Sequence, residues 1–585
     1  MSIAFCLGGD MMNCNVFVVL FIWLSVIQST LSVVSSLKTE ASIKRPNVLF
    51  LVIDDLRPAL GCYDYPKVIS PNIDQLASRS VLFENAHVQQ TVCGPSRTSF
   101  LTSRRPDTTR LYDFGSYWRT HAGNFTSLPQ HFKENGYFTY SIGKVFHPGI
   151  CSNHNDDYPL SWSKPAYHPS TQAYMMAKVC PDADGKRYMN LLCPVDVSTQ
   201  PEGSLPDIQS SEHAVDMLKE FQADSSEQPF FLAVGFHKPH IPYKFPKDFL
   251  KLYPLKEIDL APNPFKPIGL PDVAFAPYHR LRIRHDFGLL NVSFPYGPVP
   301  ETFQKRIRQH YYSSVSYTDS RVGIVLNQLE ESGFANNTII VLLGDHGWSL
   351  GEHAEWCKYE NFEVVTRIPL MVHMPGMTDI NLTNEKKFPF QDVLKSGSSQ
   401  RYKIERGPRS TALVEAVDVF PTLAELAGLK VPPTCPLDTL KVDFCTEGAS
   451  LAKVMMKSAQ KTFLKVKKLS SKDMSGDNED WKDAVFSQYP RPSVHPQWSS
   501  DLPDLKDIKI MGYTMRTRHH RYTEWVAFNP ATFQADFNSV YARELYLRDS
   551  DPLEVYNVGN LPMYEDLVMK MRKKLIAGWR EALPK

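Results

Sequence analysis

The chain of 585 residues carries 64 lysines and arginines against 63 aspartates and glutamates, which gives a formal net charge of +1. A charge so close to zero argues against a dedicated nucleic-acid-binding protein, which usually shows a strong basic excess, but it leaves room for a local basic cleft that binds an anionic substrate. Hydrophobic residues make up 43% and charged residues 22% of the chain. This composition excludes wholesale disorder, and the length suggests roughly two to four domains.

The N-terminal segment predicts entry into the secretory pathway. Residues 16–27 (VFVVLFIWLSVI) form an almost wholly apolar run, which suits a signal peptide and is short for a membrane span of about 20 residues. Small residues near 30–36 offer a cleavage site, so we expect a signal peptide over residues 1–34. Because no Lys or Arg precedes the apolar run, a retained signal anchor is the alternative. No later segment is apolar over about 18 residues, and no stable membrane span is expected in the mature chain.

The mature part carries further marks of that pathway. Four Asn-x-Ser/Thr sequons offer glycosylation sites, at Asn124, Asn291, Asn336 and Asn381. Because the pathway permits disulfides, cysteines that lie close in sequence within loop-like stretches are expected to pair, as Cys180–Cys193 and Cys435–Cys445. Apart from Cys93, whose role is separate, an odd three remain, of which at least one must be unpaired: Cys62, Cys151 and Cys357.

Three continuous apolar runs rich in β-branched residues indicate strands that are buried on both faces, as in a parallel sheet. These runs are residues 47–53, 229–235 and 338–343. Each is followed by polar residues, and polar groups at the carboxyl ends of parallel strands are where open α/β sheets place their sites. Amphipathic helical patterns lie between them, at residues 71–80, 210–221 and 303–329, the last with a break expected near 313–316. The alternation predicts an α/β fold with helices on both faces of the sheet.

The pattern changes after residue 428. Residues 455–480 are rich in Lys, Ser and Asp, which indicates an exposed linker where a protease can cut; a solvated helix followed by a loop is an equal alternative. Later strand-like runs indicate a smaller α+β region, at residues 508–514, 522–528 and 544–547. The expected organisation is an N-terminal α/β catalytic domain over 35–454, the linker, and a C-terminal α+β subdomain over 481–585.

Two pairs of residues at strand ends predict a metal site. Asp54 and Asp55 follow the first strand, and two adjacent carboxylates repel each other unless a cation or solvent neutralises them. Hard oxygen ligands suit Ca²⁺ or Mg²⁺, and Asp345 with His346 after the last strand can complete the site. Two solvated loop aspartates are the alternative for the first pair taken alone.

Residues 93–102 (CGPSRTSFLT) predict a loop that leads into a helix N-terminus, since Pro95 suits the first helical turn. Cys93, with Arg97 projecting nearby, is expected to have a lowered pKa and to act as a nucleophile at a helix end able to hold an anion. A surface loop with a chance cysteine is the alternative. Charge and protons for an anionic substrate would come from Lys144, His147, His237 and Lys358. Each of these four alone is more often structural or solvated, and it is their convergence on strand ends that favours function.

Residues 93–102 also carry the signature of the sulfatases, Cys-x-Pro-Ser-Arg followed by Leu-Thr, and the chain resembles that family from about residue 46 to about residue 557. The matching stretches outside the signature include residues 47–55, 70–77, 143–147, 345–347, 418–428 and 544–557. The resemblance implies an alkaline-phosphatase-like fold, in which a large, mainly parallel sheet is sandwiched by helices and followed by a smaller C-terminal α+β domain.

The resemblance also implies a cofactor chemistry. A formylglycine-generating enzyme would oxidise Cys93 in the endoplasmic reticulum to formylglycine, whose hydrate attacks the sulfate ester and then expels sulfate by an intramolecular elimination. One Ca²⁺ would be held by Asp54, Asp55, the residue 93 oxygen, Asp345 and His346. His346 departs from the Asn of many relatives, and Ser103 stands where the signature usually has Gly. Because that tail helps the modifying enzyme recognise its target, we expect Cys93 to be converted with lower efficiency.

Five further residues receive catalytic roles from the resemblance. Arg97 and Lys144 would hold the hydrated aldehyde as an alkoxide, and His147 would be the base for the elimination. His237 and Lys358 would hold the sulfate and protonate the leaving oxygen.

Within the family, several stretches are similar to the members that remove the 2-O-sulfate of L-iduronate at the non-reducing ends of heparan sulfate and dermatan sulfate in the lysosome. They are residues 104–112, 145–149, 237–242, 348–358 and 487–492. Such a substrate carries a carboxylate beside the sulfate, so a second cationic site is required, for which Arg105, His353 and Arg491 are candidates. Trp348 can pack on a sugar face, although a place in the core is the commoner fate of Trp. A lysosomal sorting receptor would bind the N-glycans.

Three alternatives have to be weighed against this function. A phosphatase or phosphodiesterase of related fold uses Ser or Thr as nucleophile and two Zn²⁺ ions with more His ligands, and Cys93 before Pro-Ser-Arg argues against it. A non-catalytic glycan-binding paralogue would lack a member of the cluster, and none is missing. A sulfatase for another glycosaminoglycan sulfate position stays open.

Overall fold

A seven-stranded sheet forms the centre of the larger part of the molecule. The computed structural model describes residues 45–584 except 66, 380–385, 397–403 and 467–480, so the expected signal peptide (1–34) and Asn381 lie outside the described residues. The strands are β1 (Asn47–Ile53), β2 (Val81–His87), β3 (Phe138–Gly143), β7 (Phe230–Phe236), β9 (Thr338–Gly344), β10 (Arg367–His373) and β11 (Arg409–Glu415). Their order is β11-β2-β10-β9-β1-β7-β3, and β10 alone runs antiparallel to its neighbours. The prediction of a large, mainly parallel sheet is therefore confirmed.

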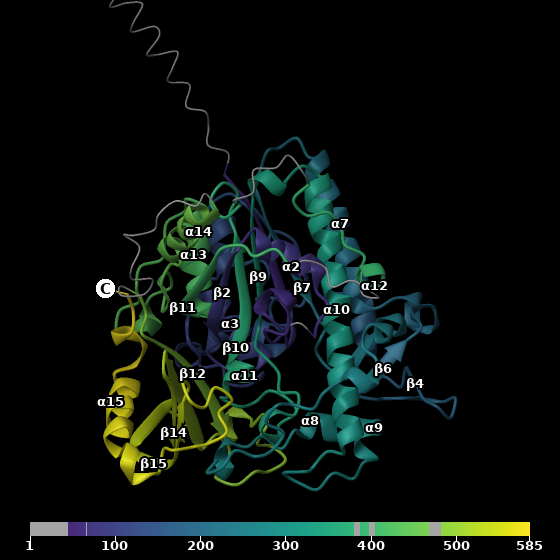
Figure 1. The fold of residues 1–585 in the computed structure, drawn as a ribbon. Helices are drawn as coiled ribbons and strands as arrows, with labels where there is room; N and C mark the ends of the chain where they lie inside the picture. Colours follow the sequence, from purple (N-terminus) through teal and green to yellow (C-terminus); the bar gives the residue numbers. More distant parts are fainter. Residues whose placement is uncertain (1–44, 66, 380–385, 397–403, 467–480, 585) are drawn as a thin grey trace, which may run out of the picture. The chain divides into compact units, whose positions relative to one another are not determined.

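Helices cover both faces of this sheet. The longer ones are α2 (Pro71–Ser78), α3 (Cys93–Thr102), α6 (Leu128–Glu134), α7 (Pro206–Ala223), α10 (Glu301–Glu331), α13 (Val419–Leu426) and α14 (Ala452–Val466). Alternate side chains of β1 point to opposite faces, so Leu49 and Leu51 join the core under α7 and α10, while Val48 and Phe50 join the core under α3, α13 and α14. Figure 1 shows α7 and α10 on one side of the sheet and α13 and α14 on the other.

Helix α10 runs without interruption where the sequence suggested a break near 313–316. The hydroxyl of Ser313 donates to the carbonyl oxygen of Gln309 at 2.9 Å, and that of Ser316 donates to Ile69 O at 2.6 Å. Both hydroxyls donate to carbonyl oxygens, which have two lone pairs and can accept a second hydrogen bond, so the serines are accommodated, and the predicted break is wrong.

A smaller antiparallel sheet follows in the chain. Its strands β12 (Ala484–Arg491), β13 (Ile510–Thr517), β14 (His520–Asn529) and β15 (Gln534–Leu547) are neighbours in chain order. Helix α15 (Glu565–Glu581) packs Val568, Met571 and Leu575 against this sheet, as Figure 1 shows in yellow. The smaller C-terminal α+β domain is therefore confirmed as part of the fold, and both sheets belong to one unit, Pro46–Lys585.

The segment expected to be an exposed linker is helical in its first part. Residues 455–466 belong to α14, where Val454, Met455 and Ala459 are buried against the core. Apolar residues at helical spacing outweigh the polar composition here. The remainder, 467–480, lies outside the described residues, and cleavage in it stays a prediction.

Short elements fill the loops between these helices and strands. They are α4 (Pro106–Thr109), α5 (Trp118–His121), α8 (His279–Arg282), α9 (His285–Gly288), α11 (Glu363–Thr366), α12 (Val393–Ser396), β4 (Cys180–Pro181), β5 (Arg187–Tyr188), β6 (Leu192–Val195) and β8 (Tyr243–Pro246). Among the described residues, no helix combines the length and the apolar character needed to cross a membrane.

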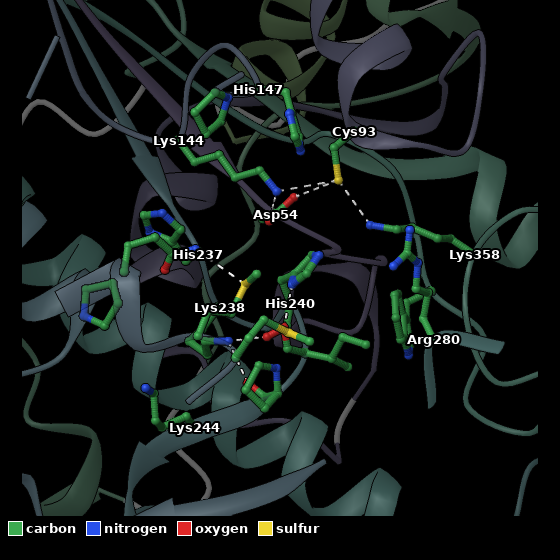
Figure 2. A pocket seen from close by; sticks show the side chains of 18 of the residues that line it. Asp54, Cys93, Lys144, His147, His237, Lys238, His240, Lys244, Arg280 and Lys358 are labelled. Carbon is green, nitrogen blue, oxygen red and sulfur yellow. Dashed lines mark hydrogen bonds and ion pairs between the residues drawn. The ribbon is translucent and has the colours of Figure 1, made fainter. Parts of the chain in front are cut away.

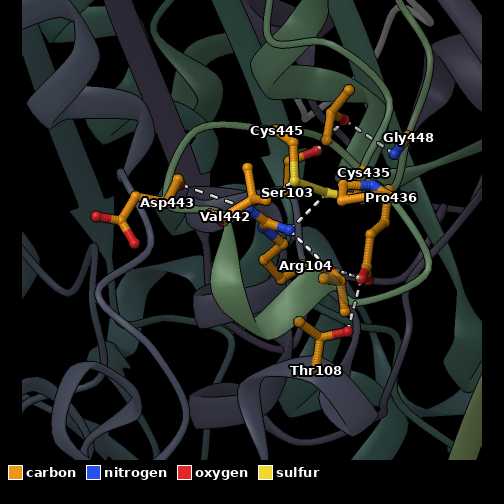
Figure 3. The surroundings of a disulfide bond; sticks show 12 residues. Ser103, Arg104, Thr108, Cys435, Pro436, Val442, Asp443, Cys445 and Gly448 are labelled. Carbon is orange, nitrogen blue, oxygen red and sulfur yellow. Dashed lines mark hydrogen bonds between the residues drawn. A yellow bond between two sulfur atoms is a disulfide. The ribbon is translucent and has the colours of Figure 1, made fainter.

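Both predicted disulfides are present, Cys180–Cys193 and Cys435–Cys445. The second closes a loop that packs on the C-terminal end of α3, where Ser103 Oγ contacts Thr446 Oγ1 at 2.6 Å and Arg104 Nη1 donates to Cys435 Sγ at 2.5 Å (Figure 3). Apart from Cys93, three cysteines of the described residues are free and buried, namely Cys62, Cys151 and Cys357. Three of the sequon asparagines are exposed, namely Asn124, Asn291 and Asn336.

Candidate active site

The site lies at the edge of the central sheet where adjacent parallel strands end. Asp54 and Asp55 follow β1, Lys144 follows β3, and Asp345 and His346 follow β9. Because β1 lies between β7 and β9 and runs parallel to both, their carboxyl ends meet, as expected for an open α/β sheet. The structure thus brings both predicted pairs, Asp54–Asp55 and Asp345–His346, together, although residues 55 and 345 are 290 positions apart in the chain.

Cys93 is the first residue of α3 and points into this cluster. Its Sγ lies 3.3 Å from Asp54 Oδ1, 3.3 Å from His346 Nε2, 3.0 Å from Lys358 Nζ and 3.6 Å from Lys144 Nζ. Burial and the Asp54 carboxylate raise the pKa of the thiol in spite of the two lysines. The lowered pKa expected from a helix N-terminus is therefore wrong, because desolvation outweighs the nearby cations.

Arg97 is fully buried and joins two carboxylates of the cluster. Its Nε donates to Asp345 Oδ2 at 2.8 Å and its Nη2 to Asp54 Oδ1 at 3.1 Å, while Nη1 donates to Val145 O at 3.0 Å. Lys144 Nζ adds an ion pair to Asp54 Oδ2 at 2.6 Å. Burial alone would raise the pKa of Asp54, but these cations hold it well below its usual range, so Asp54 is ionised.

The cluster has the donors and the unmet charge of a cation site. Ligand atoms of Asp54, Cys93, Asp345 and His346 all lie within 4.8 Å of one another. Asp55 Oδ2 is buried and has no hydrogen-bond partner among the described residues. Burial, with the Asp54 and Asp345 charges, raises the pKa of Asp55 to about 7 although Lys358 Nζ lies 2.7 Å from its Oδ1. Carboxylate oxygens in this state fit a hard divalent cation.

His346 is able to join such a site as a neutral ligand. Burial and the Lys358 charge lower its pKa well below the usual value. Its Nδ1 lies 3.0 Å from its neighbour Gly347 O, so that nitrogen carries the proton and Nε2 presents a lone pair to Cys93 and Asp55. A backbone partner that fixes the tautomer is the usual arrangement around a metal-binding imidazole.

A cavity of about 380 Å³ opens in front of the cluster (Figure 2). Predicted residues in its wall are Asp54, Cys93, Lys144, His147, His237, Trp348 and Lys358. The His147 ring stacks on Phe114 with 4.2 Å between ring centroids, and burial followed by the charges of Lys144 and Arg97 holds its pKa well below the usual range. His147 is therefore neutral and able to accept a proton.

His237 and Trp348 are held firmly in this wall. His237 Nδ1 lies 3.2 Å from Asp207 Oδ1, which also accepts the backbone N–H of His237 at 2.7 Å. Trp348 is 1% exposed and packs in the core, with Lys358 Nζ 5.6 Å from its ring centroid. This buried ring supports Lys358 as well as lining the cavity.

Three of the predicted substrate-binding residues lie elsewhere and are corrected to structural roles. Arg105 forms a bidentate pair with Glu415, with both distances 2.7 Å. His353 Nε2 donates to Leu553 O at 2.8 Å, and its ring stacks on a neighbouring Phe ring. Arg491 donates to four backbone carbonyl oxygens. All three are buried and outside the cavity wall, because each is used to join segments that are distant in the sequence.

Other cationic residues line the cavity that sequence reasoning did not select. They are Lys238, His240, Lys244, Arg280 and Arg284. His240 follows β7 in the same short polar stretch as His237, and its Nε2 lies 4.0 Å from Asp55 Oδ2. The arginines come from the basic run at 279–285 (HRLRIRH), which was the available signal for them.

Comparison with known proteins agrees with this geometry. The family model described as Sulfatase matches residues 46–429, so the chain belongs to the sulfatase family, whose members are sulfuric ester hydrolases. Among curated relatives, iduronate 2-sulfatase of Mus musculus is 54% identical over 528 residues (90% of this chain, 93% of the relative), and that of Homo sapiens is 53% identical over 546 residues (92% and 96%).

Solved structures share the fold. Phosphonate monoester hydrolase of Agrobacterium radiobacter superposes with a TM-score of 0.61 at 18% identity, covering 92% of this chain and 96% of its own. A protein in complex with its substrate D-glucosamine-2-N,6-O-disulfate superposes with a TM-score of 0.60 at 19% identity, covering 92% and 99%. At these identities the likeness shows the alkaline-phosphatase-like sulfatase fold alone.

Proposed function

We infer that the chain hydrolyses the 2-O-sulfate ester of L-iduronate at the non-reducing ends of heparan sulfate and dermatan sulfate. The single observation that carries the substrate class is the 53–54% identity to two iduronate 2-sulfatases over at least 90% of both chains. The cavity of about 380 Å³ supports it, since a pocket of this size suits a terminal sugar. A complete cluster around Cys93 speaks against the non-catalytic paralogue.

Oxidation of Cys93 to formylglycine is part of the proposal. The hydrated aldehyde supplies a nucleophilic hydroxyl and a second hydroxyl through which sulfate is released. The buried thiol, with its raised pKa, is a poor nucleophile in its own right, which supports conversion before activity. Ser103, in place of the usual Gly, adopts the left-handed conformation (φ 54°) at the end of α3, where its Oγ donates to Val417 O at 2.5 Å, so the fold accommodates it.

One Ca²⁺ would be held by Asp54, Asp55, the residue 93 oxygen, Asp345 and His346. When bound, it would lower the pKa of a coordinated hydroxyl and screen the repulsion between anions. The orphaned oxygen of Asp55 supports such a cation. Arg97, which touches two of the carboxylates and does not line the cavity, would position them.

The other charged residues of the cavity would have separate roles around the sulfur atom of the sulfate ester. The Cys93 Sγ stands in for the formylglycine oxygen, so Lys144 and Lys358, at 3.6 and 3.0 Å from it, would hold the oxygen anion and the sulfate. Neutral His147 would take the proton that starts sulfate release. His240, whose Nε2 lies 4.0 Å from Asp55 Oδ2, would join His237 in protonating the leaving sugar oxygen.

The cellular part of the proposal is a lysosomal enzyme delivered through the secretory pathway. The exposed asparagines of three sequons support N-glycans, through which a lysosomal sorting receptor would bind. The formylglycine-generating enzyme would be a transient partner, and sulfated glycosaminoglycan chain ends would be the substrates.

The test combines mass spectrometry with a paired assay. The tryptic peptide 80–97 from secreted protein should carry the aldehyde at residue 93, and an unmodified cysteine in every molecule would overturn the hydrolase mechanism. Sulfate release should be seen from 2-sulfated iduronate ends and not from 6-sulfated glucosamine ends. Hydrolysis of the 6-sulfated glucosamine ends alone would overturn the specificity for iduronate and show that the enzyme acts on another sulfate position.

A further inference from the structure

One side of the cavity holds positive charge that the catalytic cluster does not use. Lys144 and Lys358 are paired with Asp54 and Asp55. By contrast, four cations of the same wall form no ion pair with a carboxylate in the described part of the chain, namely Lys238, Lys244, Arg280 and Arg284. In Figure 2 Lys244 is drawn at the end of the cavity opposite Cys93.

Arg284 is the most constrained of the four. It is 4% exposed, and its Nε and Nη1 are buried without a hydrogen-bond partner among the described residues. The nearby Asp286 carboxylate is engaged by the backbone N–H groups of Leu191 and Leu192, at 2.6 and 3.0 Å. Burial, together with the Arg280 charge, lowers the pKa of Arg284 to about 10 although Asp286 opposes the shift. A buried guanidinium left in this state is costly unless an anion approaches it.

Lys244 lines the same cavity as this arginine, is subject to its charge, and is almost as poorly compensated. It is 6% exposed, and its Nζ reaches one carbonyl oxygen, Tyr174 O, at 3.4 Å, which is a long hydrogen bond. Burial and the Arg284 charge lower the pKa of Lys244 to about 8.

The other two cations differ from this pair. Lys238 Nζ donates to Pro242 O at 2.7 Å and also to His240 O, so it holds the turn after β7. Arg280 is exposed, so its guanidinium is free to attract an incoming anion.

We propose that Lys244 and Arg284 form a second anion-binding subsite in the cavity, which holds a carboxylate or sulfate of the substrate other than the ester that is hydrolysed. The inference rests on the proposed function and deepens it. Two like charges close together in a partly desolvated wall repel each other, and an anion between them relieves that repulsion as it forms charge-assisted hydrogen bonds. The subsite therefore selects substrates that carry two anionic groups.

The test compares substrates with one and with two anionic groups. Lys244→Met and Arg284→Gln remove the two charges, and Lys247→Met is the matched control, because Lys247 is exposed, pairs with Asp196 at 3.2 Å and lies outside the cavity wall. Each variant is assayed on an aryl sulfate whose only anionic group is the sulfate ester, on a 2-sulfated iduronoside, on its carboxyl-reduced analogue, and on a disaccharide with a sulfate on the second sugar. Thermal unfolding by circular dichroism checks that each variant is folded.

We expect Lys244→Met to lower kcat/KM about tenfold to 100-fold on the doubly anionic substrates, mainly through KM, since hydrogen bonds to charged groups are lost. On the aryl sulfate its loss should be at least tenfold smaller. If the carboxylate occupies the subsite, the large loss vanishes with the carboxyl-reduced analogue. If the second sulfate occupies it, the large loss appears with the disaccharide alone.

Equal losses on all four substrates, or no loss beyond that of Lys247→Met, would overturn the subsite. Arg284→Gln should show the same order of kcat/KM losses among the four substrates. If this variant fails to fold, the result for Lys244→Met alone tests the subsite. Failure of the wild-type enzyme to hydrolyse any of the sulfate esters would instead overturn the proposed function.

Discussion

Replacing Lys358 by Met is the most direct test of how the site stabilises charge. The Nζ of Lys358 lies 3.0 Å from Cys93 Sγ and 2.7 Å from Asp55 Oδ1, in a side chain that is 2% exposed. Removing one preorganised donor from such a desolvated site costs about 2.7–4 kcal/mol of transition-state stabilisation, or about 10²–10³ in kcat. The methionine keeps most of the side-chain volume against Trp348, so packing losses should be small.

A second buried lysine offers the matched control. Lys482 Nζ pairs with Glu415 at 2.8 Å and Asp418 at 2.5 Å, and its side chain is 1% exposed, but it lies outside the cavity wall. Lys482→Met should lower the free energy of unfolding by about 3–5 kcal/mol, as expected when a buried pair loses one partner, with kcat/KM within a few-fold of wild type. The assay is kcat/KM on a 2-sulfated iduronoside, normalised to the formylglycine content measured by mass spectrometry. A loss below tenfold for Lys358→Met, or an equal loss for both folded variants, refutes the reasoning.

The other predictions concern release, metal, disulfide and the corrected arginine. His147→Ala should lower kcat about 10²–10⁴-fold and leave a burst of one alcohol product per site in rapid-quench kinetics, and a loss without a burst contradicts its role in release. Chelation should lower the unfolding temperature, and Ca²⁺ at 100 times its Kd should restore about 2.7 kcal/mol; an unchanged temperature argues against a resident cation. Replacing Cys435 and Cys445 by Ser should reduce stability by about 2–4 kcal/mol in denaturant titrations. Arg105→Met should destabilise by about 3 kcal/mol with little change in KM, whereas a raised KM on a stable protein would return Arg105 to substrate binding.

The sequence was a good guide to what is encoded locally. Strands β1, β7 and β9 were predicted because each is a continuous apolar run buried on both faces. The position of β10, which lies antiparallel between β2 and β9, could not be predicted from the sequence, because strand order depends on contacts between distant segments. The two residue pairs of the site, Asp54–Asp55 and Asp345–His346, were found because they directly follow such strands.

The roles of several charged residues could not be predicted from the local sequence. Arg105 looked available for a substrate carboxylate because its partner Glu415 lies 310 positions away. Arg284 was missed because the basic run between α8 and α9 is far in sequence from the residues after β1 and β9 with which it lines the cavity. The pKa of Cys93 was misjudged because the sequence reveals a helix end but not the depth at which the fold buries it.

The burial of α3 means that an enzyme can modify its first residue, Cys93, only before folding is complete. All of its residues are buried, and Cys93 itself is 1% exposed, so a modifying enzyme has no access to the thiol once the sheet and helices have assembled. If Cys93 is oxidised as proposed, oxidation has to occur before folding is complete. The fraction of active molecules then depends on the rate of oxidation relative to the rate of folding. Variants that fold slowly would then yield fewer molecules, each more often carrying the aldehyde, while rapid folding would produce stable protein that is permanently inert.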